Sequence, residues 1–381
     1  MSYTIAIDAR KIRDFGIGTY VRNLVRHLVE IDRDNQYLLL TGPTGGKQLS
    51  RLGDNVKTIP QRSPVYSIRE QVTLSWTLFR AKVDLYHSTH YVLPSLLPCP
   101  AVVTIHDIIH LLYPEFLPNR VAYFYAEQML RRAVTKSERI IAVSRNTRKD
   151  LMSYFDVDGE DIEVVYNGID DTFLEPVSDD DLDRWLQNLG LERPYLLFVG
   201  NPKPHKNLDN VVKALARARE KSDFPHRLVC VGGRDEALEW KIRQRAEQEG
   251  IADRLVLLGH VAQEALPAIY RGASLFLYPT LYEGFGLPVV EAMASGVPVI
   301  TSNGSALKEI AAGYAHLVNP LDVDGLARAI VQCLNDKEHT ASLAKLGLRR
   351  SQDFRWPKAA EQTLEIYRRV LADATPRGKV A

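Results

Sequence analysis

Short apolar runs and longer amphipathic stretches alternate along most of the chain. Residues 3–8 (YTIAID) form a compact apolar run, which is typical of a buried strand. Residues 16–31 then repeat apolar side chains at helical spacing from Val21 to Ile31, so that one face of a helix is apolar. This pattern predicts a first strand followed by a first amphipathic helix.

The same alternation continues to the end of the chain. Further strand-like runs, each short, apolar and closed by polar or turn residues, occupy residues 36–41, 83–88, 101–107, 139–144, 163–170, 195–200, 227–233, 255–261, 274–279, 298–301 and 315–320. Helical patterns lie between them, such as residues 146–155, for which Ser144 or Asn146 is the expected cap. Alternating strands and helices predict an α/β protein with parallel, doubly wound sheets.

A polar, acidic and proline-flanked segment interrupts the alternation near the middle of the chain. We therefore predict a Rossmann-like N-terminal domain over residues 1–176, an interdomain segment over 177–193 and a second Rossmann-like domain over 194–355. The last segment, 356–381, is expected to be a helix that packs back toward the first domain. A length of 381 residues suits two domains better than one core. Ligands of such sheets bind beyond the carboxyl ends of the strands, so two facing domains would form a cleft.

Charge and cysteine content narrow the class of protein. The net charge is +1, which argues against a nucleic-acid partner bound through bulk charge. The three cysteines are scattered, without metal or disulfide spacing, which favours a reducing compartment. The N-terminal residues lack the features of a signal peptide, and no apolar window is long enough to cross a bilayer. A cytoplasmic location is expected.

The stretch YEGFGLPVVEAMASGVPVI (282–300) carries the clearest chemistry. Glu283 precedes a glycine-rich turn at the end of a predicted strand, and Glu291 falls one turn into the following helix. The first N–H groups of such a helix bind anions, and Pro288 suits its first turn. Carboxylates on either side of an anion site accept hydrogen bonds from hydroxyl groups, which suits a polyhydroxylated phosphate ester.

This stretch resembles the Glu-x7-Glu signature of retaining glycosyltransferases of the GT-B fold, and nearly the whole chain is similar to their family 4. The resemblance implies two Rossmann-like domains that face each other across a cleft. It also implies that Glu283 binds hydroxyls of the donor sugar and that Glu291 binds the ribose. The intervening residues would hold sugar and diphosphate through their amides: Gly284, Phe285, Gly286 and Leu287.

The turn VGNPKPHKNL adds to the resemblance and departs from it at one position. Lys206 matches the lysine that neutralises the donor diphosphate in the family. Asn201 stands where the family usually has an arginine, and an amide carries no charge. Lys203 is the candidate to supply the missing positive charge.

The remaining site candidates also follow from the resemblance. Gly16 and Gly18 would contact the donor phosphate or the acceptor, although a glycine turn that only starts a helix is the alternative. His106 would bind a donor hydroxyl, and Asp107 would orient that imidazole or contact the acceptor.

A further strand end is expected to form the base site. There the backbone of Gly259, His260 and Val261 would contact the nucleobase, whereas Tyr270 is expected in the core.

The implied reaction transfers a sugar from a nucleotide diphosphate to a hydroxyl with retention of configuration. No nucleophile is evident, so the leaving phosphate oxygen would take the acceptor proton. No cofactor and no divalent metal are expected, because the Asp-x-Asp runs at 156–158, 179–181 and 322–324 are explained by a polar loop and by helix caps.

Donor and acceptor are the least constrained part of the prediction. The segments around 84–94 and 106–116 look most like bacterial mannosyltransferases of polysaccharide or lipopolysaccharide assembly, which favours GDP-mannose and a glycan or lipid-linked acceptor. No residue pattern separates GDP from UDP or ADP, and the oligomeric state stays open. The aromatic, basic segment 119–139 is expected to be a solvated helix face; a peripheral contact with the inner face of a membrane is the alternative.

Three other functions remain as alternatives. A nicotinamide dehydrogenase fits poorly, because GIGTYV lacks the third glycine and the strand at 36–41 ends without an acidic residue. A nucleotide-sugar epimerase shares the architecture but would release a free sugar. A non-catalytic nucleotide-sugar-binding protein would keep Glu291 and the base loop without needing Lys206 or His106.

Overall fold

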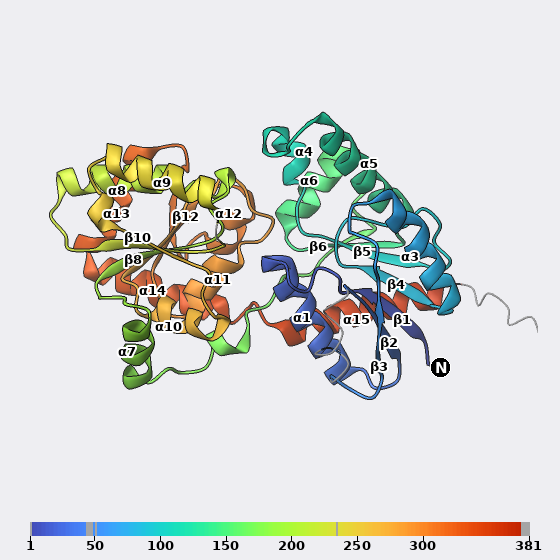
Figure 1. Ribbon diagram of the computed structural model, residues 1–381. Coiled ribbons are helices and arrows are strands. Elements are labelled where there is room, and N and C mark those ends of the chain that lie inside the picture. The colour runs from blue at the N-terminus through green and yellow to red at the C-terminus, as the bar shows by residue number, and fades with distance from the viewer. Residues whose placement is uncertain (1, 43–48, 50–51, 234, 375–381) are drawn as a thin grey trace, which may run out of the picture. The chain divides into compact units, whose positions relative to one another are not determined.

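The computed structural model describes residues 2–42, 49, 52–233 and 235–374 and divides the chain into two compact units (Figure 1). The first unit comprises Met1–Gly168 and Arg355–Ala381, and the second comprises Ile169–Phe354. The chain thus leaves the first unit once and returns to it.

The first unit is built on a parallel sheet that, in the described residues, has seven strands in the order β3-β2-β1-β4-β5-β6-β7. The strands are β1 (Thr4–Asp8), β2 (Gln36–Thr41), β3 (Val56–Pro60), β4 (Leu85–Ser88), β5 (Ala101–Ile105), β6 (Arg139–Ala142) and β7 (Ile162–Val164). The order reverses between β1 and β4, which pair directly through Ile5 and Leu85. Ligands of doubly wound sheets bind at such a reversal.

Helices cover both faces of this sheet: α1 (Phe15–Ile31), α3 (Ile68–Arg80), α4 (Ile109–Leu112), α5 (Arg120–Lys136), α6 (Arg145–Phe155) and α15 (Trp356–Asp373). Alternate side chains of β1 point to opposite faces. Ile5 and Ile7 pack with α1 and α15, whereas Ala6 packs with α3. Figure 1 shows α1 and α15 on one side of the strands and α3 and α5 on the other.

Helix α15 belongs to the core of the first unit, although it is the last element of the chain. The Tyr367 hydroxyl is hydrogen-bonded to Nδ1 of His87, and Nε2 of His87 is 2.8 Å from the Thr104 hydroxyl. Trp356 is buried at the start of the helix, where a Cβ on Gly168 would lie 2.2 Å from its backbone nitrogen. Only glycine therefore fits where the two segments at the junction pass each other.

The second unit has, in its described residues, a parallel sheet of six strands in the order β10-β9-β8-β11-β12-β13. The strands are β8 (Tyr195–Val199), β9 (Arg227–Val231), β10 (Leu255–Gly259), β11 (Leu275–Tyr278), β12 (Val299–Ser302) and β13 (His316–Val318). The order reverses between β8 and β11, where Leu275 pairs with Leu196.

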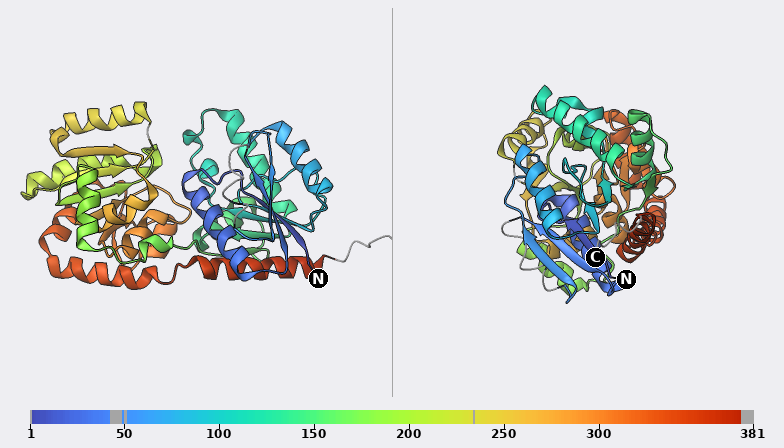
Figure 2. Two further views of the ribbon diagram at one scale, coloured as in Figure 1. Left: turned by 60° about the horizontal axis from the view of Figure 1, so that its bottom comes forward. Right: turned by 90° about the vertical axis from the view of Figure 1, so that its right-hand side faces the viewer.

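The second unit also has helices on both faces of its sheet: α7 (Asp179–Asn188), α8 (Leu208–Lys221), α9 (Glu236–Gln248), α10 (Leu266–Arg271), α11 (Leu287–Ala294), α12 (Ser305–Ala311), α13 (Val323–Asn335) and α14 (Lys337–Ser351). Helix α8 packs against α9 and α13, and α11 packs against α10 and α14. Figure 1 and the left view of Figure 2 place these two groups on opposite sides of the strands.

The predicted fold class is confirmed, and two details differ from the sequence prediction. Strand β3 was not predicted, because Val56 is its one buried residue and its sequence, VKTIP, contains no continuous apolar run. The contacts place the division at residues 168/169 and 354/355, and the segment predicted to link two domains forms helix α7, which packs on α10 in the second unit. Residues 375–381 of the predicted last segment lie outside the described residues.

Helix caps agree with the sequence patterns. The Ser144 hydroxyl accepts a hydrogen bond from the Thr147 amide at the start of α6. Asp322 and Ser178 cap α13 and α7 in the same way, so acidic runs at 179–181 and 322–324 are parts of helix starts.

Within the described ranges, no helix combines the length and the apolar character that a membrane-spanning segment requires.

Candidate active site

The carboxyl ends of β8 and β11 bring Lys206 and Glu283 together. Lys206 ends a short 3-10 turn, Pro204–Lys206, after β8, and Glu283 lies in the loop after β11. Because these strands are neighbours, Nζ of Lys206 lies 2.6 Å from Oε1 of Glu283 and donates to the Tyr278 hydroxyl at 3.0 Å. Two residues 77 positions apart thus form an ion pair at the reversal point of the sheet.

The environment of this ion pair keeps the lysine charged. The side chains of Lys206 and Glu283 are 18% and 13% exposed. Burial lowers the pKa of Lys206, but the Glu283 carboxylate and the Tyr278 hydroxyl outweigh it and raise the pKa above its ordinary value. A lysine Nζ has three N–H donors, so one remains for a ligand beside the two contacts with Glu283 and Tyr278.

The loop that carries Glu283 is held by the start of α12. The Glu283 amide donates to the Ser305 hydroxyl at 3.2 Å, and the Ala306 amide donates to the Glu283 carbonyl at 3.3 Å. Gly286 has a φ of +100°, and a Cβ there would lie 2.4 Å from Cδ2 of Leu307. The loop therefore requires glycine at position 286 for both conformation and space.

Helix α11 begins directly after this loop. Gly286 is its N-cap, and Pro288 occupies its first turn. No side chain caps the first turn. Pro288 has no N–H, and the Val289 amide donates to the Gly286 carbonyl at 2.9 Å, so the Leu287 amide is the donor of this turn that is placed to bind an anion. Phe285 is buried against the Phe354 ring, 5.5 Å between centroids, so its contribution to a ligand would come from the backbone.

Glu291 lies one turn into α11 and is bound by Tyr270 of α10. The Tyr270 hydroxyl donates to Oε2 of Glu291 at 2.9 Å. Burial raises the pKa of Glu291 to about 7, while the hydrogen bond from Tyr270 works against the rise. Tyr270 is buried, as the sequence predicted, but its hydroxyl also orients a predicted ligand-binding carboxylate.

The ends of β8, β9 and β10 form the predicted base-binding edge. Oδ1 of Asn201 accepts a hydrogen bond from the Gly233 amide at 2.7 Å. Gly259 has a φ of +68°, and its carbonyl accepts from the Gly232 amide at 3.0 Å. A small cleft opens here, lined by residues that include Gly200, Pro202, Cys230, Gly232, Glu239 and Gly259.

Asn201 thus connects the loop after β8 to the loop after β9. This gives it a structural role at the position where the resemblance leads one to expect an arginine. Lys203 and His260 are exposed beside it, and Val261 is half-buried.

The other predicted site residues belong to the first unit. Nε2 of His106 donates to the Thr89 carbonyl at 3.0 Å, and burial lowers the pKa of His106 to about 4, so the imidazole is neutral at pH 7. The Asp107 carboxylate accepts from the Ile109 amide at 3.0 Å and so starts α4.

The two glycines differ in their packing. Gly18 is buried, and a Cβ there would lie 2.5 Å from the Ile12 carbonyl oxygen. Gly16 is exposed in the first turn of α1.

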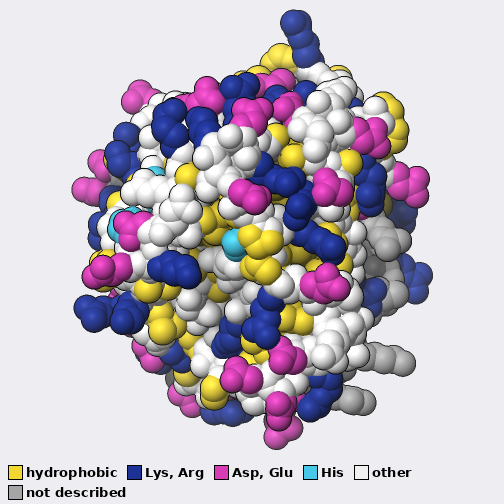
Figure 3. Space-filling model, turned by 90° about the vertical axis from the view of Figure 1, so that its left-hand side faces the viewer, with side chains coloured by type: hydrophobic (Ala, Val, Ile, Leu, Met, Phe, Trp, Pro, Cys, Tyr) yellow, Lys and Arg dark blue, Asp and Glu magenta, His cyan; other side chains and the backbone are white. Residues whose placement is uncertain are grey.

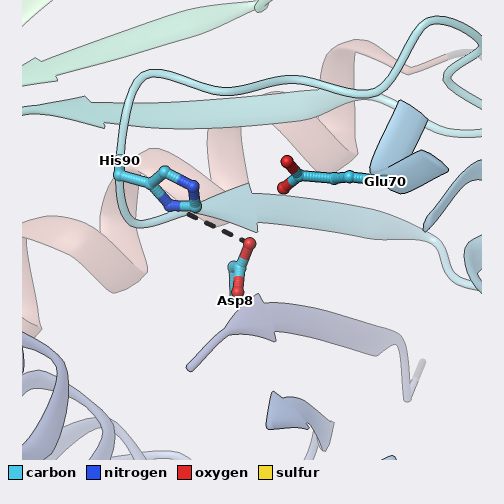
Figure 4. Close-up of side chains that lie close together, drawn as sticks. All are labelled: Asp8, Glu70 and His90. Atoms are coloured by element: carbon cyan, nitrogen blue, oxygen red, sulfur yellow. Dashed lines mark ion pairs between the residues drawn. The ribbon is translucent and has the colours of Figure 1, made fainter. Parts of the chain in front are cut away.

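A buried charged cluster that the sequence did not indicate lies where the first sheet reverses its strand order. Figure 4 shows Asp8, Glu70 and His90 converging from β1, α3 and the loop after β4. Arg10 lies between the carboxylates, with Nη2 2.5 Å from Oδ2 of Asp8 and 2.5 Å from Oε1 of Glu70. Nδ1 of His90 is 3.9 Å from Oδ2 of Asp8.

The chemistry of this cluster favours an internal ion pair over a cation site. Three ligand atoms of Asp8, Glu70 and His90 lie within 4.8 Å of one another, as a metal would need. However, the Arg10 guanidinium already pairs with both carboxylates, offsets one of their two negative charges and would repel a cation. Burial would raise the pKa of Asp8, but Arg10 outweighs it and holds the pKa well below its usual range. Burial lowers the pKa of His90 to about 4.

Solved structures with the same architecture define the class of protein. Sucrose-phosphate synthase from Thermosynechococcus elongatus is 22% identical with a TM-score of 0.80, and the match covers 98% of this chain and 100% of that one. The Anabaena protein HepE in complex with UDP-glucose is 20% identical with a TM-score of 0.77, and the match covers 96% and 100%. At these identities the likeness establishes the fold: the two Rossmann-like units form a GT-B architecture.

Sequence comparison establishes the family. The model described as Glycosyl transferases group 1 matches residues 179–350, and the model described as Glycosyltransferase Family 4 matches residues 16–173. One model matches each half of the chain, so the chain belongs to the glycosyltransferases that these two models describe. It is also 28% identical to the O-antigen chain mannosyltransferase B of Escherichia coli, over 97% of this chain and 100% of that protein.

Proposed function

We propose that the chain transfers mannose from GDP-mannose, with retention of configuration, to a hydroxyl of a glycan or lipid-linked acceptor in the assembly of a cell-surface polysaccharide. The observation that carries the proposal is the Lys206–Glu283 ion pair at the β8/β11 reversal, beside the uncapped start of α11. The full-length likeness to an O-antigen mannosyltransferase supports the choice of sugar and product.

Each group would have a separate role in donor binding. Lys206 and the first amides of α11, around Gly286 and Leu287, would meet the negative charge of the diphosphate. Glu283 would accept hydrogen bonds from sugar hydroxyls, and Glu291 would accept them from the ribose. The backbone of Gly259, His260 and Val261 would contact the base.

In the transfer step, the main contribution of the protein would be positive charge that stabilises the leaving diphosphate. As the bond between the anomeric carbon and the diphosphate breaks, negative charge grows on the leaving oxygen, and Lys206 lies where it would stabilise that charge. The acceptor hydroxyl would attack the same face of the sugar and give its proton to the leaving phosphate oxygen. Because Nε2 of His106 donates to Thr89, its Nδ1 is the ring atom that would accept from a sugar hydroxyl. Asp107 would contact the acceptor.

We further propose that the reaction needs no divalent metal and takes place in the cytoplasm. Lys206 and the α11 amides would supply the positive charge that a metal supplies in other transferases, with Lys203 as a second cation. The exposure of Lys203 leaves its ammonium group accessible for that role.

Donor choice is tested by thermal-shift titration of the full chain with GDP, UDP, ADP and their sugar conjugates, with and without EDTA. We expect GDP and GDP-mannose to raise Tm selectively and to the same extent with EDTA. Stabilisation by another nucleotide family would overturn the choice of donor. Dependence on added Mg²⁺ would overturn the metal-free mechanism.

Catalytic roles are tested by Lys206→Met and Glu283→Gln, with transfer of labelled mannose as the readout. Each variant should lose at least about 100-fold in turnover, because each removes a charge that faces the reacting centre. Lys203→Met is the matched control for removing a cation from the same turn and should retain more activity than Lys206→Met. Circular dichroism and Tm check folding; a folded Lys206→Met variant with wild-type turnover would contradict the assignment.

A further inference from the structure

The outward face of helix α3 carries a continuous apolar stripe. Ile68, Val72, Trp76 and Phe79 recur at helical spacing and are 85%, 69%, 62% and 65% exposed, respectively. Leu96, 76% exposed, extends the stripe, because its amide lies 3.4 Å from the Ser75 hydroxyl. Apolar side chains of this size are seldom exposed together on a soluble surface without a partner.

This exposed stripe is not needed to hold the helix in place. The opposite face of α3 packs into the core through Leu74 and Leu78, and Glu70 pairs with the buried Arg10. Figures 1 and 2 show α3 on the outside of the first unit, and no other element among the described residues of that unit lies across its outer side. The stripe is therefore fixed in an outward orientation by contacts on the other side of the helix.

The charges around the stripe are positive. Arg69 and Arg80 are exposed on the same helix, and Lys82 is exposed directly after it. The one carboxylate of α3, Glu70, is buried and pairs with Arg10. An exposed apolar face that includes Trp and Phe, flanked by cations, is the pattern of a helix that lies in the interface of an anionic bilayer.

The charges of helix α5 and of the face shown in Figure 3 differ from those beside the stripe on α3. Arg131 of α5 pairs with Glu127 at 3.1 Å, so part of the positive charge of α5 is offset by a carboxylate of the same helix. In Figure 3, Lys and Arg are interspersed with Asp and Glu, without a field of one sign. Helix α5 also exposes two apolar side chains, Val121 and Phe124. Helix α3 exposes four at helical spacing and has cations beside them, so the observations favour α3.

We propose that α3, together with Leu96, docks the first unit on an anionic lipid bilayer, with the stripe at the boundary between headgroups and acyl chains. This surface goes beyond the proposed transfer reaction, because docking requires neither donor nor acceptor. It would bring the enzyme to the two-dimensional surface where lipid-linked substrates are found.

The test is flotation of the full-length protein with vesicles of phosphatidylcholine, with and without phosphatidylglycerol. We expect binding to the mixed vesicles and weaker binding to phosphatidylcholine alone. The double variant Trp76→Ser/Phe79→Ser should lose at least about tenfold in vesicle affinity, because the buried apolar area falls. Trp240→Ser is the matched control: Trp240 is 61% exposed on α9 of the second unit and should have no effect.

The contribution of positive charge to vesicle binding is tested with a second variant and its control. Arg69→Glu/Arg80→Glu should weaken binding to the mixed vesicles more than to phosphatidylcholine alone, whereas Arg184→Glu in α7, whose side chain is 69% exposed, should leave both unchanged.

Two results would overturn the proposal: no flotation of the wild-type protein, or equal flotation of the wild type and the Trp76/Phe79 variant. A wild-type dimer that becomes a monomer in the same variant, without any vesicle binding, would assign the stripe to self-association instead. The thermal shift with GDP-mannose is measured in parallel. Circular dichroism and the Tm of the ligand-free variant check that the first unit is folded. Retention of the GDP-mannose shift shows that the donor site in the second unit is intact, so loss of docking is distinguished from failure of the proposed donor site.

Discussion

The pKa of Glu291 in the second unit is set by two opposing effects, burial and a hydrogen bond. Its burial raises the pKa to about 7, and the Tyr270 hydroxyl limits that rise by donating to the carboxylate. A group with this pKa changes its charge within the physiological range. Its charge state, and with it the ability to accept two hydroxyl hydrogen bonds, depends on pH.

We predict that affinity for GDP-mannose rises as the pH increases from about 6 to about 8. The free protein then shifts from protonated to ionised Glu291, and the ionised form is the one that accepts bonds from both ribose hydroxyls. Tyr270→Phe should move the midpoint to higher pH, because the hydrogen bond that lowers the pKa is lost. Isothermal titration calorimetry at a series of pH values measures the affinity for GDP-mannose. The diphosphate of GDP-mannose does not titrate between about pH 6 and 8, so the ligand itself does not contribute to the pH dependence.

Glu291→Gln is the control for this profile, because the amide cannot ionise. Its affinity should be lower and nearly independent of pH. A pH dependence that persists unchanged in Glu291→Gln would assign the titration to another group.

Sequence reasoning placed Glu283, Lys206 and Glu291 in their loops and helices because these positions depend on local signals: a strand end, glycines and a helix start. It could not pair Lys206 with Glu283 or Glu291 with Tyr270, since those contacts depend on which strands are neighbours. The cluster of Asp8, Arg10, Glu70 and His90 was missed for the same reason. Its members come from three separate segments with no shared motif.

At the scale of elements, the start of α12 shapes the loop before α11. Ser305 and Ala306 bind the backbone of Glu283, and Leu307 fills the space beside Gly286. The anion-binding end of one helix is therefore positioned by the next helix along the chain. Sequence alone indicated the glycine turn but not this support.

Gly286→Ala should destabilise the protein by about 1–3 kcal/mol, because the positive φ is unfavourable for alanine and its Cβ collides with Leu307. Gly296→Ala is the matched control: its φ is +70°, but nothing lies within 4 Å of a Cβ there. Gly286→Ala should therefore cost more than Gly296→Ala in chemical denaturation and should also weaken nucleotide binding. Combining Gly286→Ala with Leu307→Ala should not restore stability fully, since the backbone strain remains; complete recovery would show that the clash alone matters.

At the scale of the whole molecule, most of the groups predicted to bind the donor lie in the second unit, whereas Gly16, Gly18 and His106 belong to the first. The second unit has its own sheet, helices and buried core. The first unit, by contrast, depends on both ends of the chain, because α15 packs against α1.

We predict that residues 169–354 fold on their own and bind GDP-mannose more weakly than the full chain, because the proposed contacts of Gly16, Gly18 and His106 are missing. A protein ending at residue 354 should lose the cooperative unfolding of the first unit, because the core side chains Trp356 and Tyr367 are missing. Differential scanning calorimetry with and without GDP-mannose checks both fragments. An unfolded 169–354 fragment would mean that the second unit needs the first for stability.

The chain enters the second unit at Ile169 and leaves it at Phe354, and the Ile169 amide donates to the Phe354 carbonyl at 3.1 Å. Entry and exit are therefore adjacent, so the whole unit can be replaced through two neighbouring joints without lengthening either connection. Recombination among related enzymes could exchange such a cassette while leaving the rest of the chain unchanged. Donor specificity and acceptor specificity could then change independently during evolution. Under the proposed function, this would be one route to new surface polysaccharides.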